Sequence, residues 1–183
     1  MPVLDLAPID PERAPANVAD TLADVRQRYG FVPNLYRFFA NTPGALKGYL
    51  AISDLFGQGT LSATERNVVL LAVSRANGCR YCVAVHSAVA DMQHDDAAVT
   101  DAIRNGTPIA DLRLEALRRL AQALARDATD AGAEVAAFLA AGFAPGQVLE
   151  VVLGLTLKTL SNTTNHLVET PLDAVFAKRA WSE

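Results

Sequence analysis

The segment Leu71-Ala-Val-Ser-Arg-Ala-Asn-Gly-Cys-Arg-Tyr-Cys-Val-Ala-Val-His86 contains two helix-forming runs that flank a short break. The first run is mostly apolar and ends at Asn77-Gly78, a pair that favours a left-handed cap or a tight turn. We expect Cys79 to open a second helix. Because an α-helix turns by about 100° per residue, Cys79, Cys82 and His86 then share one narrow face.

The two cysteines and the histidine form a pattern typical of thiol redox enzymes. Residues three apart on a helix meet the limit of about 7 Å between the Cα atoms of a disulfide. A cysteine reacts as its thiolate, which a helix N-terminus and a nearby imidazole both favour. Because His86 follows Cys82 by one turn, we assign Cys82 as the attacking thiolate, Cys79 as the resolving thiol, and His86 as the base or ion-pair partner.

The spacing of the pair indicates two related reactions. Attack of Cys82 on a small peroxide gives a sulfenic acid, which Cys79 then converts into an internal disulfide. An external dithiol must reduce that disulfide. The same pair can instead exchange with the disulfide of a partner through a mixed disulfide, and the sequence does not separate these directions.

Other interpretations of the same residues lead to different functions. Free cysteines on a helix can be inert small hydrophobes. A zinc site would combine Cys79 and Cys82 with His86 and would need a fourth ligand, for which His94 and His166 are the candidates. Structural zinc pairs normally sit on turns that wrap the ion, so we expect no metal and no cofactor. A redox- or zinc-responsive binding protein without turnover is the alternative from another class.

The rest of the chain also favours helices, because proline and glycine punctuate runs of alanine, leucine and valine without a sustained alternating pattern. The aromatic residues of 31–39 are expected to pack in the core rather than to bind substrate. The prediction is an all-α multi-helix bundle, a single domain with an N-terminal helical extension (residues 1–60) packed on a core (residues 61–183). Helices are expected at 16–29, from Thr42-Pro43 to 57–59, from a Ser62-x-x-Glu65 capping box to 77, and at 96–105, 111–126, 132–141 and 145–168.

Composition limits the partners and the location. The chain has 183 residues, of which 51% are hydrophobic, and a net charge of −4 without a run of like charges, which argues against nucleic acid or an anionic membrane as the partner. The start of the chain lacks the pattern of a secretory signal, and the apolar segment Val148–Leu160 is too short to cross a bilayer. We therefore expect a cytoplasmic protein. The excess of apolar residues also favours a homo-oligomer.

The segments Leu61-Ser-Ala-Thr-Glu-Arg66 and Leu71–His86 together resemble the alkylhydroperoxidase D-like (AhpD-like) group of the carboxymuconolactone decarboxylase superfamily. The resemblance implies an all-helical fold, assembly into trimers or hexamers, and a cysteine pair that acts in peroxide reduction or disulfide exchange. It also implies that the second cysteine, Cys82, reacts with the peroxide and that His86 activates it. Members specialised for lactone decarboxylation typically lack the full pair, so a decarboxylase or other lyase on the same fold is a further alternative.

One position departs from the family pattern. A glutamate twelve residues before the first cysteine feeds protons to the histidine in the family, and Asn67 stands there in this chain. The nearest acid, Glu65, is rotated from that position by about 200° on a helix, so the two side chains cannot reach the same point. Asn67 can fix the tautomer of His86 but cannot accept a proton. Glu65, Asn67 and His166 are therefore the three candidates for a proton relay, and the alternative role of His166 is to satisfy carbonyls near a helix end.

Overall fold

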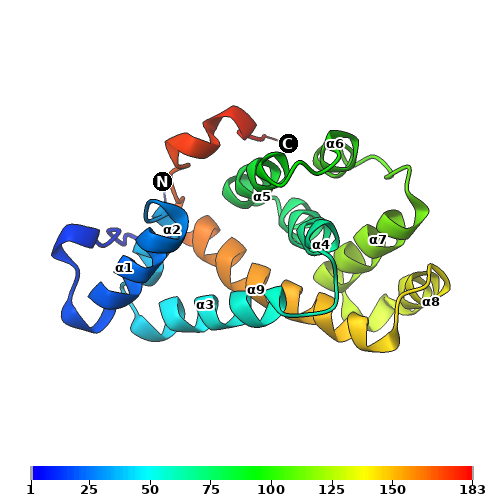
Figure 1. Cartoon of the computed structure of the whole chain (residues 1–183), viewed down its shortest axis with the longest axis horizontal. Helices are drawn as coiled ribbons and strands as arrows, with labels where there is room; N and C mark the ends of the chain where they lie inside the picture. The colour runs from blue at the N-terminus through cyan, green and yellow to red at the C-terminus, as the bar shows by residue number, and fades with distance from the viewer. Residues whose placement is uncertain (1, 183) are drawn as a thin grey trace.

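The computed structural model describes residues 2–182, and within this range nine α-helices follow one another without a β-strand (Figure 1). The prediction of an all-α fold is confirmed. The helices are α1 (Ala16–Tyr29), α2 (Asn34–Phe39), α3 (Pro43–Gly57), α4 (Ala63–Ala76), α5 (Arg80–Met92), α6 (Ala97–Asn105), α7 (Leu112–Arg126), α8 (Gly132–Ala140) and α9 (Pro145–Val168). Three short 3-10 helices, η1 (Pro11–Arg13), η2 (Ala128–Asp130) and η3 (Ala174–Arg179), complete the described structure.

The local signals that start and stop helices act as expected. Ser62 caps α4, since its hydroxyl accepts from the Glu65 backbone N–H at 3.1 Å and the Glu65 carboxylate accepts from the Ser62 backbone N–H at 2.8 Å. Gly78 adopts a left-handed conformation, with φ of 62°, which a side chain would strain. The chain can therefore turn between α4 and α5, and Cys79 becomes the N-cap of α5.

Helix α4 lies at the centre of the bundle, between α5, α7 and α9 (Figure 1). Its long apolar run is buried because neighbours cover it on several sides, as for Val69, Leu71 and Val73. Helix α9 comes especially close at Gly154, where a Cβ atom would stand 2.8 Å from Val69 Cγ1. A side chain at Gly154 would force α9, which carries part of the site described below, away from α4.

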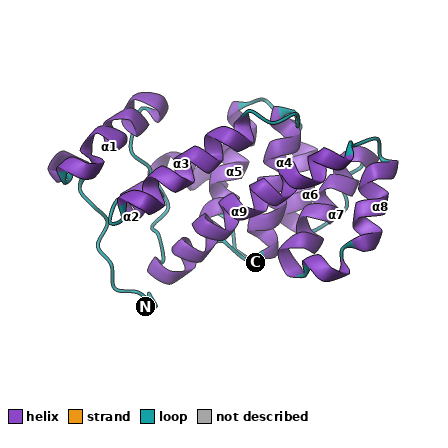
Figure 2. Ribbon diagram, turned by 90° about the horizontal axis from the view of Figure 1, so that it is seen from below, coloured by secondary structure: helices purple, strands orange, loops and turns teal. Residues whose placement is uncertain are grey.

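The N-terminal part of the chain packs on the same helices. Helix α3 lies along α9, while α1 lies at one end of the molecule and α7 and α8 at the other (Figure 2). Tyr36 of α2 stacks edge-on against Tyr49 of α3, with ring centroids 5.5 Å apart. A division between an extension and a core at residue 60 stays a prediction.

The C-terminal segment crosses α5 through η3. The Arg179 guanidinium pairs with the carboxylates of Asp91 and Asp101, and the Arg104 guanidinium donates to the carbonyl oxygens of Arg179 and Ala180, both at 3.1 Å. These contacts hold Phe176 against the site on α5. Within residues 2–182, no helix combines the length and apolarity that a bilayer crossing requires.

Candidate active site

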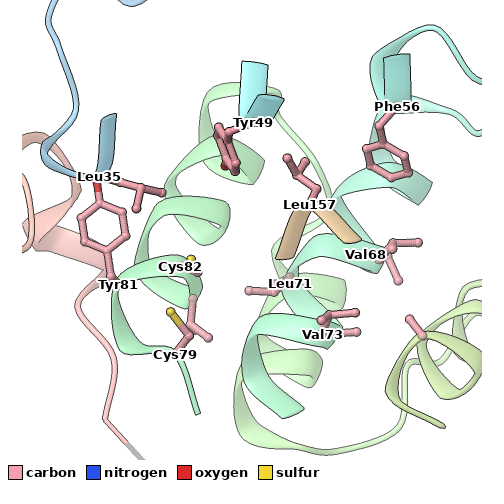
Figure 3. Close-up of a cluster of buried hydrophobic side chains, with 14 of the residues drawn as sticks. Leu35, Tyr49, Phe56, Val68, Leu71, Val73, Cys79, Tyr81, Cys82 and Leu157 are labelled. Atoms are coloured by element: carbon pink, nitrogen blue, oxygen red, sulfur yellow. The ribbon is translucent and has the colours of Figure 1, made fainter. Parts of the chain in front are cut away.

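Cys79 and Cys82 lie together inside the protein as free thiols. Both are buried, with exposed fractions of 1% and 2%. One amide nitrogen, Nδ2 of Asn165 on α9, stands 3.2 Å from Cys82 Sγ and 3.7 Å from Cys79 Sγ. Figure 3 places the two sulfurs between Tyr81 on one side and Leu71 of α4 on the other. Both cysteine sulfurs thus contact the same amide nitrogen within an otherwise mainly apolar core.

The surroundings of Cys82 favour its thiolate form. Burial alone would raise the pKa of Cys82, but the hydrogen bond from Cys79 and the positive charge of Lys158 outweigh burial and hold that pKa well below its usual value. The pKa of Cys79 is raised, because its thiol donates to Cys82 and is itself buried. The hydroxyl of Ser161 lies 3.9 Å from Cys82 Sγ. The opposite pKa shifts of the two thiols favour ionisation of Cys82 over ionisation of Cys79.

His86 contacts a lysine. Its Nε2 atom lies 2.9 Å from Nζ of Lys158 on α9. An ammonium group can only donate, so in a contact with protonated Lys158 the Nε2 atom is the acceptor. Burial and the charge of Lys158 lower the pKa of His86 well below its usual value, so the ring is neutral. From the sequence we expect the His86 imidazole to lie beside Cys82. Within residues 2–182, the recorded hydrogen bond of this ring joins it to Lys158.

The three relay candidates do not reach the imidazole ring among the described contacts. Asn67 donates to the backbone carbonyl of His86 at 3.2 Å. This hydrogen bond holds the backbone of α5 and does not set the tautomer of the His86 ring. Glu65 serves the α4 cap and pairs with Arg113 at 3.2 Å. Nε2 of His166 lies 2.9 Å from the carbonyl oxygen of Asn77. Among the recorded contacts, the side chain that meets the His86 ring is Lys158. We had expected Glu65, Asn67 or His166 there.

Lys158 belongs to a buried polar stripe on α9 that sequence reasoning missed. Its members, on the inner face of the helix, are Lys158, Ser161, Asn162 and Asn165. The signal was present, since a lysine in a segment otherwise rich in valine and leucine, followed by polar residues at helical spacing, indicates a polar face. That signal does not reveal which partner helix the stripe meets.

Two cavities flank the pair. A mainly apolar cavity of about 460 Å³ reaches Cys82, His86 and Lys158. The aromatic segment 31–39, which we expected to pack in the core, also contributes to the wall of this cavity. Its residues Leu35 and Tyr36 are buried and line the cavity. The remaining lining residues come from α1, the loop between α1 and α2, α3, α4, α5, α9 and the C-terminal segment: Tyr29, Gly30, Phe31, Pro33, Tyr49, Ser53, Leu70, Tyr81, Val85, Val89, Met92, Leu157, Val175 and Phe176.

The second cavity is polar and reaches Cys79 instead. It measures about 450 Å³, and its lining residues are Gly78, Cys79, Arg80, Tyr81, Asn165, His166, Glu169 and Thr170. Its buried polar atoms include Oδ1 of Asn165 and Oγ1 of Thr170, for which no hydrogen-bond partner is recorded. Cys82 and Cys79 thus line two different cavities, one suited to apolar molecules and one to polar molecules.

Zinc ligands are not gathered in the described part of the chain. Within residues 2–182, no three side chains of His, Cys, Asp or Glu stand close enough to hold a metal ion. His166, a fourth-ligand candidate, bonds to the Asn77 carbonyl instead.

Comparison with known proteins agrees with this fold. The family model described as "Carboxymuconolactone decarboxylase family" matches residues 33–143. A structure of an alkylhydroperoxidase AhpD core, an uncharacterized peroxidase-related protein from Ralstonia eutropha JMP134, aligns over 96% of this chain and 95% of its own, with a TM-score of 0.84 and 22% identity. A peroxidase-related protein from Silicibacter sp. TM1040 aligns over 96% and 93%, with a TM-score of 0.81 and 19% identity.

A third similar structure is a cysteine-to-alanine variant of the debrominase Bmp8 in complex with 2,3,4-tribromopyrrole, which aligns over 96% of this chain and 95% of its own, with a TM-score of 0.80 and 14% identity. No curated protein matches the chain significantly in sequence. The likeness to solved structures establishes the fold, while the family match spans more than half of the chain. The protein belongs to the carboxymuconolactone decarboxylase family and has the AhpD-like fold.

Proposed function

We propose that the protein is a thiol peroxidase that reduces organic hydroperoxides, with Cys82 as the attacking thiolate and Cys79 as the resolving thiol. The observation that carries the proposal is the shared contact of both sulfurs with Asn165, combined with a pKa of Cys82 that is lowered and a pKa of Cys79 that is raised. One sulfur is ready to attack, and the other keeps the proton that the second step needs.

The oxidative half of the reaction follows from this pair. The Cys82 thiolate attacks the terminal oxygen of the hydroperoxide, an S–O bond forms, and the O–O bond breaks. The leaving alkoxide takes up a proton and departs as an alcohol. Cys79 then attacks the sulfenic sulfur, the S–O bond breaks, and the hydroxide leaves as water with the proton of the Cys79 thiol. The products are an alcohol, one water and a Cys79–Cys82 disulfide.

The reductive half requires an external dithiol, for which the polar cavity offers the approach. In thiol exchange, the sulfur with the lower pKa leaves faster. Because the pKa of Cys82 is lowered, attack by the dithiol on Cys79 expels Cys82 as a stabilised thiolate. Cys79 lines the polar cavity, so the incoming dithiol need not enter the apolar cavity. The second thiol of the reductant then releases Cys79 and carries away the disulfide.

The turnover test uses the whole chain with cumene hydroperoxide and dithiothreitol. We expect hydroperoxide to disappear at a rate proportional to enzyme, with one dithiothreitol oxidised for each hydroperoxide reduced. The double variant Cys79→Ala, Cys82→Ala serves as the control for reduction by the dithiol alone. Equal rates for the wild type and this double variant would exclude a thiol peroxidase.

The apolar cavity predicts a preference among peroxides. Burying the ring of cumene hydroperoxide against side chains such as Leu35 and Tyr36 removes apolar surface from water, whereas hydrogen peroxide has none to bury. At about 25 cal/mol per Å², even partial burial is worth about 1.5 kcal/mol, so kcat/KM for cumene hydroperoxide should exceed that for hydrogen peroxide by at least about tenfold. Steady-state kinetics with both peroxides measures the ratio, and a ratio at or below unity would contradict a cavity that selects organic hydroperoxides.

Reductive dehalogenation of an aromatic compound is a second candidate. Aromatic side chains, including Phe31, Tyr36 and Tyr49, line the cavity at Cys82, and a debrominase with a bound tribromopyrrole has the same fold. The Cys82 thiolate would take the halogen, the aryl group would gain a proton, and Cys79 would displace halide to form the same disulfide. Bromide release from a brominated pyrrole faster than hydroperoxide reduction would favour this candidate.

Assembly into a trimer or hexamer is expected from the family resemblance. Several large apolar side chains are exposed on the single chain, among them Leu55, Leu112 and Leu149. Burial of such side chains between copies would favour association. Sedimentation velocity at micromolar concentration should give a species of three or six chains, and a monomer would contradict the expectation.

A further inference from the structure

The side chain of Lys158 is buried on α9. Its exposed fraction is 1%, yet none of the ion pairs recorded for residues 2–182 involves it. Its recorded side-chain hydrogen bond joins Nζ to the neutral ring of His86. Burying an ammonium group without an opposite charge costs several kcal/mol, so such a lysine is retained only where the charge is used.

The ionisable groups around Lys158 identify its counter-charge. Helix α5 presents Cys82 and His86 to the same cavity wall as Lys158, and α3 presents Tyr49. Burial raises the pKa of Tyr49 and keeps its phenol neutral, and the lowered pKa of His86 keeps the imidazole neutral. Cys79 keeps its proton because its pKa is raised. The thiolate of Cys82 is the remaining anion in this group, and its pKa is lowered in part by Lys158.

We propose that Lys158 is a catalytic residue of the peroxide reaction, which holds Cys82 as a thiolate and then donates the proton that converts the leaving alkoxide into an alcohol. The inference rests on the proposed peroxidase function and adds to it an acid, because this chain has Asn67 at the position of the family's glutamate. Lys158 and Cys82 line the same cavity, which a hydroperoxide would occupy, and the charge of Lys158 lowers the pKa of Cys82. His86 holds Nζ in position through Nε2.

The protons balance without an outside source. In the resting enzyme the negative charge lies on Cys82 and the extra proton on Lys158. Attack on the peroxide consumes both, leaving a sulfenic acid, an alcohol and a neutral amine. Disulfide formation releases water with the proton of Cys79. Reduction by a dithiol returns one hydrogen to each sulfur, and the proton gained at Cys82 passes to the amine of Lys158, which restores the starting charges.

The test separates the charge of Lys158 from its proton. The chain has two cysteines, so Cys79→Ser leaves Cys82 as the single thiol. In this background we compare Lys158→Met, which keeps a similar length without charge, with Lys47→Met, which removes the charge of an exposed lysine on α3. The rate of alkylation by iodoacetamide against pH gives the thiol pKa of Cys82 and needs no peroxide. The rate of reaction with cumene hydroperoxide is then measured at each pH.

We expect Lys158→Met to slow alkylation at pH 7 by at least about tenfold and to shift the alkylation profile to higher pH, because the thiolate loses its counter-charge. Lys47→Met should keep the profile of the parent. The melting temperature of Lys158→Met, measured beside that of its parent, shows whether the variant is folded. An unchanged alkylation profile in a folded Lys158→Met variant would overturn the role of Lys158 in holding the thiolate.

The acid role has its own outcome. At a pH above the raised thiol pKa, Cys82 of Lys158→Met is fully ionised, and a thiolate of higher pKa is intrinsically the better nucleophile. If Lys158 supplies the proton, this variant should still react with hydroperoxide at least about tenfold more slowly than the parent at the same fraction of thiolate. An equal or faster reaction would overturn the acid role. A parent that alkylates at low pH yet ignores hydroperoxide would instead contradict the proposed function, and the alkylation result for Lys158 would stand.

Discussion

Cys82→Ser is expected to lower hydroperoxide reduction by at least about a thousandfold. A serine hydroxyl has nearly the same shape, but it does not ionise under the conditions that make Cys82 a thiolate, and oxygen does not form the sulfenic acid on which the next step depends. Cumene hydroperoxide consumption with dithiothreitol measures the loss. Because the reacting atom itself is removed, no other single substitution in the chain should have a larger effect on the first step.

The fold of the Cys82→Ser variant must be checked beside its activity. The new hydroxyl lies within reach of the Asn165 amide and close to Ser161, so it has polar partners in the buried site. We expect the melting temperature to change by only a few degrees, about what 1 kcal/mol produces in a domain of this size. A folded Cys82→Ser variant that keeps about a tenth or more of the wild-type rate would contradict a thiolate mechanism at this position.

Cys79→Ser is expected to separate the first step from turnover. Cys82 should still react once with hydroperoxide, but the sulfenic acid has no neighbouring thiol to displace its hydroxyl group. Steady-state reduction should therefore fall by at least about a hundredfold, while a single equivalent of hydroperoxide is still consumed. Mass spectrometry after trapping with dimedone should locate the sulfenic acid at Cys82.

The same variant distinguishes the alternatives on this fold. A decarboxylase or lyase should retain most of its activity in Cys79→Ser, because no disulfide takes part in such a reaction. A binding protein that responds to oxidation should show no turnover in the wild type, and it should lose its response to oxidation in Cys79→Ser. If Cys79→Ser reduced hydroperoxide at the wild-type rate, this result would contradict the resolving role of Cys79. It would mean that the external dithiol reduces the sulfenic acid directly.

Local sequence signals predicted most of the fold because each has a local physical cause. The capping box at Ser62 and Glu65 fixes the start of α4 through two backbone N–H groups. Gly30 ends α1 in a left-handed conformation, with φ of 80°. Pro145 starts α9, and the periodic apolar residues that follow continue it to Val168. These residues act within one turn of chain, so no knowledge of distant contacts is needed to interpret them.

The candidate site was predicted only in the part that lies on one helix. The cysteines were identified because their spacing brings them together on α5. The α9 side of the site was missed, because pairing Asn165 with the sulfurs joins residues more than eighty positions apart. The sequence also leads one to seek a relay partner for His86 near position 67, whereas the ring contacts Lys158. Helical periodicity places residues on a face but does not say which helix that face meets.

In the proposed mechanism, Cys79 and Cys82 form one redox pair in which Cys82 reacts first. The most direct measurement adds one equivalent of cumene hydroperoxide to the reduced wild-type protein, blocks the remaining thiols with iodoacetamide, and maps the peptides by mass spectrometry. We expect a peptide with a Cys79–Cys82 disulfide and no alkylation at either sulfur. Two alkylated cysteines, with the hydroperoxide left unreacted, would contradict it.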